Sequence, residues 1–242
     1  MHKYVVPQTV KDRVLRRQGK LLSHDTIDPA RSALVVIDMQ NYFVAEGFPL
    51  EVPAAREIVP NINRLAAAMR GLGGLVVWIQ TTAVGGLERW GNHHRYTLTA
   101  EAARVRLANL DEAAEGFKIY AALEPLPADP RAKKITYSAF IPGSSDLNPL
   151  LRRSGVETVL IAGTVTNVCC ESSARDAMML DYRVIMVSDA NAAMTDEEHA
   201  ATLNSFYLAF GDVMTTEDAI RRLKPVVAPN SRQPPRVPKR PA

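Results

Sequence analysis

The chain has 242 residues, of which 47% are hydrophobic, so it can bury a large core and suits one α/β domain or two small ones. Its formal net charge of +3 is mild and sits largely at the two ends, which indicates solvated tails and argues against a nucleic-acid groove. No apolar run approaches the ~18 residues that cross a bilayer. The first stretch, MHKYVVPQTVKDRVLRRQ, lacks the apolar core of a signal peptide, so we expect a cytoplasmic protein that contacts no membrane.

Short apolar runs alternate along the chain with helical segments. Because most of these runs are apolar on both faces, they are typical of parallel strands that helices cover on both sides. The expected strands are residues 32–38, 74–81, 132–137, 157–164, 182–190 and 212–215. The expected helices include SSDLNPLLRRSG, capped by Ser144 or Ser145, and TDEEHAATLNSFYLAF, capped by Thr195. The alternation predicts an α/β fold of three layers, α/β/α, with a central and mainly parallel sheet of about six strands.

Three segments fall outside this alternation. Residues 1–30 form a polar N-terminal arm with short helical turns, and residues 31–224 form the domain itself. Residues 83–131 are a long insertion between the second and third strands, and insertions of this size usually cap a site, so we expect a lid. Residues 225–242 carry six prolines with arginine and lysine, which predicts an extended basic tail.

The ends of three strands carry reactive side chains. Asp38 ends the first strand, Lys134 lies in the third, and the turn after the fourth delivers Cys169 to the start of a helix. Taken singly, the aspartate suits a cap, the lysine a surface charge and the cysteine a buried apolar residue. Because ligands bind at the carboxyl ends of parallel strands, the three together indicate a nucleophile with its activators. The helix start and the ammonium would favour the thiolate, and the carboxylate would carry the proton.

The only two cysteines of the chain, Cys169 and Cys170, are adjacent. Neighbouring cysteines cannot readily pair with each other, which excludes a disulfide framework, and two thiols alone cannot make a structural zinc site.

Three stretches, ALVVIDMQNYF, KITYSAF and GTVTNVCCESSARDA, resemble the motif blocks of the isochorismatase-like cysteine hydrolases, in the same order and over about residues 30 to 222. This resemblance implies a catalytic triad of Asp38, Lys134 and Cys169. Lys134 matches rather than Lys133 because the family lysine stands three residues before the tyrosine of YSAF. Cys169 matches because the nucleophile follows the TN dipeptide after one residue, and Cys170 then takes a packing role.

The resemblance also implies a cis peptide between Thr164 and Val165, with an oxyanion hole formed by the N–H groups of Val165 and Cys169. True isochorismatases lack the cysteine, so Cys169 favours acyl transfer at a C–N bond. The nicotinamidase branch carries Asp and His metal ligands after the second strand, where this chain reads IQTTAVGG. We therefore expect no metal and no cofactor.

Side chains near the motifs are candidates for substrate contact. Asparagine and glutamine amides suit a small, polar, planar ligand, while phenylalanines at such positions also suit plain core packing. The candidates are Gln40, Asn41, Phe43, Trp90, His94, Tyr137, Phe140, Thr166 and Asn167. Whether His93 or His94 contacts the substrate stays open at this level.

The sequence thus favours a cysteine amidohydrolase that cleaves a C–N bond of a small amide, carbamoyl or ureide compound and releases ammonia. Compounds like ureidoacrylate, carbamoylated amino acids, biuret or triuret, and maleamate all fit, and the sequence does not choose among them. One alternative is a vinyl ether hydrolase of the isochorismate kind, and another is a catalytically degenerate binding subunit. The expected partners are the small-molecule substrate and further copies of the chain, in a dimer or tetramer.

Overall fold

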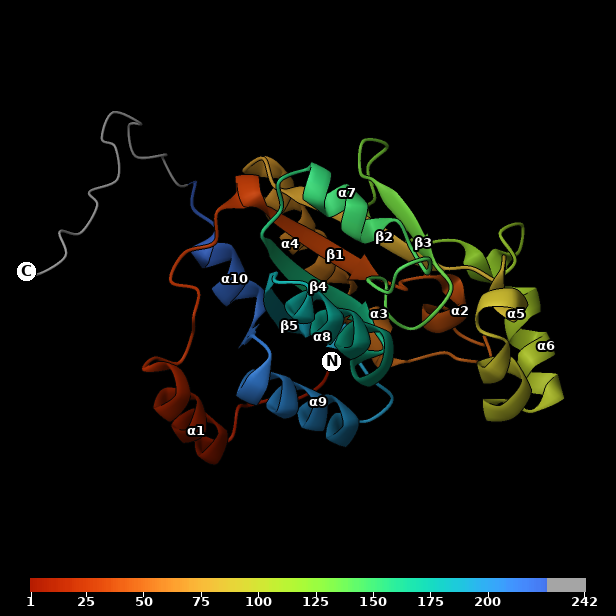
Figure 1. Ribbon diagram of the computed structural model, residues 1–242, viewed down its shortest axis with the longest axis horizontal. Coiled ribbons are helices and arrows are strands. Elements are labelled where there is room, and N and C mark those ends of the chain that lie inside the picture. The colour runs from red at the N-terminus through yellow and green to blue at the C-terminus, as the bar shows by residue number, and fades with distance from the viewer. Residues whose placement is uncertain (226–242) are drawn as a thin grey trace, which may run out of the picture.

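The structure, a computed structural model, describes residues 1–225 and contains a six-stranded sheet in the order β3-β2-β1-β4-β5-β6 (Figure 1). All five neighbouring pairs are parallel, which confirms the predicted architecture. The strands are β1 (Ser32–Ile37), β2 (Leu75–Thr81), β3 (Arg131–Lys134), β4 (Thr158–Thr164), β5 (Arg183–Ala192) and β6 (Asp212–Met214). In the described range, no helix is both long and apolar enough to cross a membrane.

Helices cover both faces of the sheet because successive strand residues point to opposite sides. Leu34 and Val36 pack into one buried cluster, while Val35 and Ile37 pack into the other. The first face is covered by α3 (Ala54–Glu57), α4 (Val59–Gly71) and α10 (Thr216–Arg222), and the second by α7 (Leu147–Arg153), α8 (Glu171–Met179) and α9 (Asp196–Ala209) (Figure 1).

Some of the predicted ends of helices and strands agree with the structure, and others differ. Thr195 caps α9 in a capping box with Glu198, as expected. β3 stops at Lys134 rather than 137, because its partner β2 ends at Thr81, opposite Lys134, and offers no further ladder. The helix predicted after Ser144 begins only at Leu147, whose N–H donates to the Ser145 hydroxyl.

The N-terminal arm contains a helix longer than the predicted turns, α1 (Gln8–Gln18), which packs against α9. Val10 and Val14 are its buried side chains. Farther along the arm, Ile27 pairs with Leu223 in an isolated parallel bridge. The arm is therefore packed onto the domain. The predicted tail lies, from residue 226 onward, outside the described residues.

The insertion between β2 and β3 lies beyond the carboxyl ends of the strands (Figure 1). It contains α5 (Gly86–Arg89), the short π-helix η2 (His93–Thr97), α6 (Ala100–Asn109) and the 3-10 turn η3 (Glu115–Phe117). Its backbone is tied to the segment that follows β1, since Asn41 N–H donates to the Lys118 carbonyl and Tyr120 N–H donates to the Met39 carbonyl. This position is the one expected of a segment that roofs a site.

The strands β1 and β4 approach each other most closely where β1 ends. Gly163 has φ +122°, and a Cβ there would lie 2.0 Å from the Ile37 carbonyl oxygen. Only glycine avoids this clash, so the strand end before the nucleophile turn is fixed against the strand end before Asp38.

Candidate active site

The three predicted catalytic side chains meet at the carboxyl edge of the sheet. The Lys134 ammonium lies 2.8 Å from Asp38 Oδ2 and 3.4 Å from the Cys169 sulfur. The negative charge of Asp38 also acts on the Cys169 thiol and raises its pKa. Three residues far apart in the sequence thus bring a carboxylate, an ammonium and a thiol into one group, and all three are buried.

Asp38 is held by a small hydrogen-bond ring. The Thr81 hydroxyl donates to Asp38 Oδ1 at 2.9 Å and accepts a hydrogen bond from Lys134 Nζ at 2.7 Å. Asp38 itself has φ +52°, a left-handed conformation that turns the chain directly after β1. Its Oδ2 forms an ion pair with Lys134 outside hydrogen-bonding angles, which leaves that oxygen free to take a proton.

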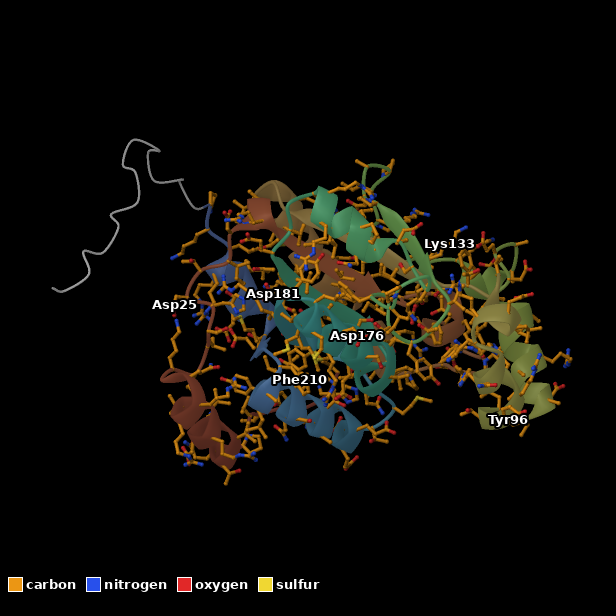
Figure 2. The ribbon with its side chains drawn as sticks, in the orientation of Figure 1. Asp25, Tyr96, Lys133, Asp176, Asp181 and Phe210 are labelled. Carbon is orange, nitrogen blue, oxygen red and sulfur yellow. The ribbon has the colours of Figure 1, made fainter. Side chains whose placement is uncertain are left out.

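The two adjacent lysines of β3 point to opposite sides, as strand geometry requires. Lys134 is fully buried, whereas Lys133 is exposed and pairs with Glu112 (Figure 2). Burial alone would lower the pKa of Lys134, but the opposing effects, of which the charge of Asp38 is the largest, raise the pKa above its ordinary value. The buried lysine therefore stays charged next to the thiol.

The state of the thiol differs from the sequence-based expectation of a favoured thiolate. Burial is the main cause that raises the pKa of Cys169 to about 12; the Asp38 charge acts in the same direction, and Lys134 acts in the opposite direction. The resting thiol is therefore protonated and needs a base at the moment of attack. Cys170 is also buried but packs in the apolar core under the sheet.

The nucleophile turn has the backbone that the resemblance implies. The Thr164–Val165 peptide is cis, and the short π-helix η4 (Thr166–Cys170) follows and leads into α8. Among residues 1–225, the Val165 N–H has no protein acceptor, while the Val165 carbonyl accepts from Val168 and Cys170. A free N–H beside the thiol is what an oxyanion hole requires.

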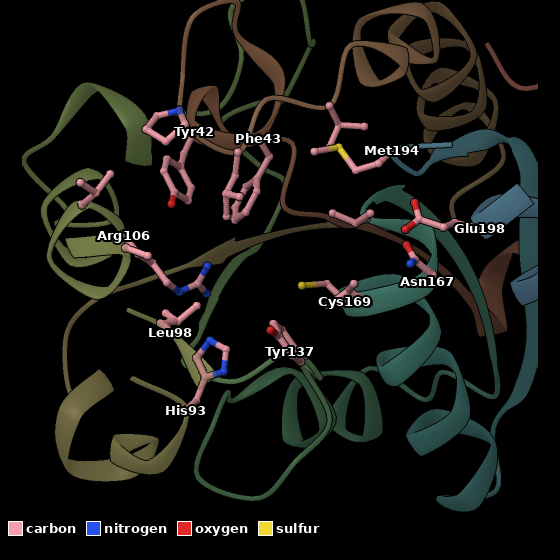
Figure 3. A pocket seen from close by; sticks show the side chains of 17 residues that line it. Tyr42, Phe43, His93, Leu98, Arg106, Tyr137, Asn167, Cys169, Met194 and Glu198 are labelled. Carbon is pink, nitrogen blue, oxygen red and sulfur yellow. The ribbon is translucent and has the colours of Figure 1, made fainter. Parts of the chain in front are cut away.

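A cavity of about 390 Å³ opens onto the Cys169 sulfur (Figure 3). Its walls come from α2 (Asn41–Val44), from the insertion, from the nucleophile turn and from the start of α9. The wall residues include Tyr42, Phe43, Leu50, His93, Leu98, Arg106, Tyr137, Val165, Asn167, Met194 and Glu198. This volume suits a small molecule.

Three of the nine substrate candidates line this cavity: Phe43, Tyr137 and Asn167. His93, left open by the sequence, also lines it, and its neighbour His94 does not. The Nδ1 atom of His94 instead lies within hydrogen-bonding distance, 3.1 Å, of the Trp90 carbonyl oxygen.

Two further candidates support the wall from behind. The Trp90 ring stacks on His93 at 3.9 Å between centroids and meets the Tyr137 ring edge to face. The Thr166 hydroxyl lies 2.9 Å from Nδ1 of the buried His199, whose ring stacks on His2 of the N-terminal arm. Neither Trp90 nor Thr166 lines the cavity, because their faces are covered by these neighbours.

The remaining three candidates are structural. Gln40 is fully buried and bridges the backbone of Thr81 and Phe117, and the Asn41 amide donates to Glu115. Phe140 packs in the core against Tyr182. In this structure Gln40 and Asn41 hydrogen-bond within the protein and Phe140 packs in the core, and none of the three lines the cavity.

Tyr42 and Arg106 line the cavity and were missed. Arg106 is the more telling omission, because it stands on the same helical face as the buried Ala103 and Leu110. A cation on the apolar side of a helix is the signal by which the sequence could have identified Arg106 as a site residue.

The isochorismatase domain, as described for that family, matches residues 32–218 of the chain. The chain belongs to the isochorismatase family. The ureidoacrylate amidohydrolase RutB of Variovorax paradoxus (strain S110) is 32% identical over 211 residues, which cover 81% of this chain and 83% of that protein.

Two solved structures share the fold of this chain. A cysteine hydrolase from Pseudomonas syringae pv. phaseolicola 1448A is 30% identical with a TM-score of 0.70, covering 81% of this chain and 94% of that chain. The N-carbamoylsarcosine amidase from Thermoplasma acidophilum is 25% identical with a TM-score of 0.60, covering 77% and 97%. In the part of the chain that the structure describes, no group of three or more His, Cys, Asp or Glu side chains is placed to hold a metal ion.

Proposed function

We propose that this protein is a cysteine amidohydrolase that cleaves a C–N bond of a small ureide or related carbamoyl compound and releases ammonia. The observation that carries the proposal is the Cys169 thiol at the cavity wall, 3.4 Å from the Lys134 ammonium, which itself lies 2.8 Å from Asp38 Oδ2. The similarity to a ureidoacrylate amidohydrolase over most of both chains supports the ureide class.

In the first step, Asp38 takes the thiol proton while the Cys169 sulfur bonds to the carbonyl carbon. The backbone N–H groups of Val165 and Cys169 hold the negative charge that forms on the oxygen. The C–N bond then breaks, and Asp38 returns the proton so that nitrogen leaves as ammonia rather than as an amide anion. The product of this step is a thioester-type acyl-enzyme.

In the second step, water adds to the acyl carbon and gives one proton to Asp38. The C–S bond breaks, the thiol recovers its proton, and the acyl group leaves as an acid, which for a ureide is a carbamic acid. Lys134 keeps its charge throughout and stabilises the thiolate whenever it forms. The insertion roofs the cavity, and we propose that it closes over the bound substrate.

Ammonia release from a panel of small amides and ureides tests the function. We expect turnover of a ureide that EDTA leaves unchanged and that iodoacetamide stops, because the proposed steps use only backbone donors, a carboxylate and a thiol. Activity that EDTA removes and zinc or manganese restores would contradict the metal-free mechanism. Cleavage of isochorismate without nitrogen release would instead establish a vinyl ether hydrolase.

We further propose a cytoplasmic homo-oligomer. A reducing compartment suits a mechanism that needs a free thiol. Large apolar side chains of the insertion stay exposed, with Tyr96 at 82% and Val84 at 60%, and such side chains favour association (Figure 2). Light scattering at micromolar concentration should give a mass at least twice the 26.6 kDa of one chain, and a mass near 26.6 kDa would contradict the proposal.

A further inference from the structure

Arg106 on α6 is a buried cation whose charge is not balanced by any carboxylate. The residue is only 7% exposed, and within residues 1–225 it takes part in no ion pair. Its guanidinium lies 6.0 Å from the centroid of the Trp90 ring. Burying a cation without an anion is costly, so Arg106 requires an anionic partner that the described residues do not supply.

The guanidinium points into the cavity and faces the Cys169 sulfur across it (Figure 3). The Tyr42 hydroxyl and the His93 ring stand on the same side of the cavity as Arg106 (Figure 3). The carboxylate of the catalytic group, Asp38, is already paired with Lys134. The Arg106 end of the cavity is therefore a donor-rich end that is fit for an anion.

The opposite end of the cavity is lined by hydrogen-bond acceptors. Asn167 Oδ1 is buried and has no hydrogen-bond partner among the described residues. Glu198 lines the same end, and its carboxylate already accepts a hydrogen bond from the Thr195 N–H (Figure 3). A buried acceptor that lacks a partner among the described residues, as Asn167 Oδ1 does, is satisfied by an N–H group of a ligand.

We propose that Arg106 determines the specificity of the enzyme by binding a carboxylate at one end of the substrate. The substrate is then a short ureido acid. Its carboxylate lies on Arg106, its carbonyl carbon lies at Cys169, and its terminal NH₂ faces Asn167. This inference rests on the proposed function, which it narrows from ureides in general to those that carry an acid group a few atoms away. Planar bidentate recognition of a carboxylate is the task for which a guanidinium is best suited.

The first test compares 3-ureidopropionate, which has the carboxylate, with the neutral butylurea. Arg106→Met should lower kcat/KM for the ureido acid about 30- to 100-fold more than for butylurea, which is the scale of lost hydrogen bonds to a charged group. Arg106→Lys should recover part of this preference. Equal losses on both substrates, or a wild type that shows no preference for the acid, would overturn the inference.

Arg104→Met is the matched control, because Arg104 is an exposed arginine on the same helix that pairs with Glu101. It should leave the preference as it is in the wild type. Thermal unfolding separates specificity from a structural role. Replacing an unpaired buried cation by methionine should keep or raise the Tm, whereas a residue that holds α6 in place would lower it.

The second test needs no turnover. Butyrate should protect Cys169 of the wild type from iodoacetamide several-fold better than 1-butanol does, and Arg106→Met should abolish this difference. Protection by butyrate without ammonia release from any ureide would refute the proposed function and keep the carboxylate site. Ammonia release without selective protection by butyrate would refute the carboxylate site and keep the proposed function.

Discussion

Cys169→Ala should lower kcat on a ureide substrate on the order of 10⁴-fold or more, because it removes the atom that forms the acyl-enzyme. Cys169→Ser should fail as well, since the oxygen is a weaker nucleophile and Asp38 is placed to deprotonate a thiol. Ammonia release under saturating substrate measures the loss, and mass spectrometry should find an acyl adduct on Cys169 of the wild type alone.

Cys170→Ala is the control for this variant. Its sulfur is buried in the core and does not line the cavity, so the change should cost packing and leave kcat within about tenfold. Limiting iodoacetamide should label Cys169 and spare Cys170. Equal losses of activity from the two changes would show that the nucleophile is wrongly assigned.

The sequence predicted the fold and the catalytic group for the same physical reason. Buried parallel strands are short apolar runs, and their carboxyl ends meet at one edge. Asp38, Lys134 and Cys169 each follow or end such a run, so their proximity could be expected before any coordinates. The identity of the correct lysine came from the family motif, and strand alternation explains it, since Lys133 must then face outward.

The walls of the cavity were harder to predict, because they depend on which polar side chains are already occupied. Gln40 looks like a ligand contact beside Asp38, yet its three hydrogen bonds join β2 to the insertion. Arg106 comes from a helix in the insertion whose place over the sheet no local pattern fixes. Only the folded chain shows that Gln40 has its hydrogen-bond partners within the protein and that Arg106 has no carboxylate partner among the described residues.

The protonation of the thiol could not be predicted either. A helix start and a nearby ammonium favour the thiolate, but these effects compete with desolvation, which depends on the depth of burial. In this structure burial dominates and raises the pKa of Cys169 to about 12. The thiol is therefore not activated before the substrate binds. Asp38 has to remove its proton during the attack.

Asp38→Asn should separate the reactivity of the thiol from turnover. Asparagine fits the left-handed conformation at this position and keeps the shape of the side chain, so the variant should fold. It cannot accept the thiol proton or return it to the leaving nitrogen, so kcat should fall about 10²- to 10⁴-fold. Circular dichroism and ammonia release measure the two expectations.

Alkylation of the same variant should change in the opposite direction. In the wild type, burial first and then the Asp38 charge stabilise the neutral thiol and raise the pKa of Cys169. Removing that negative charge lowers the thiol pKa, and Lys134 is left with the thiolate as its only close counter-charge. The rate of Cys169 labelling by iodoacetamide should therefore still be rising at pH 9 to 10 in the wild type, as expected about two units or more below the thiol pKa. In Asp38→Asn the whole profile should move to lower pH. A variant that loses turnover and is also labelled more slowly at every pH would mean that Asp38 holds the site together and does not act as its base.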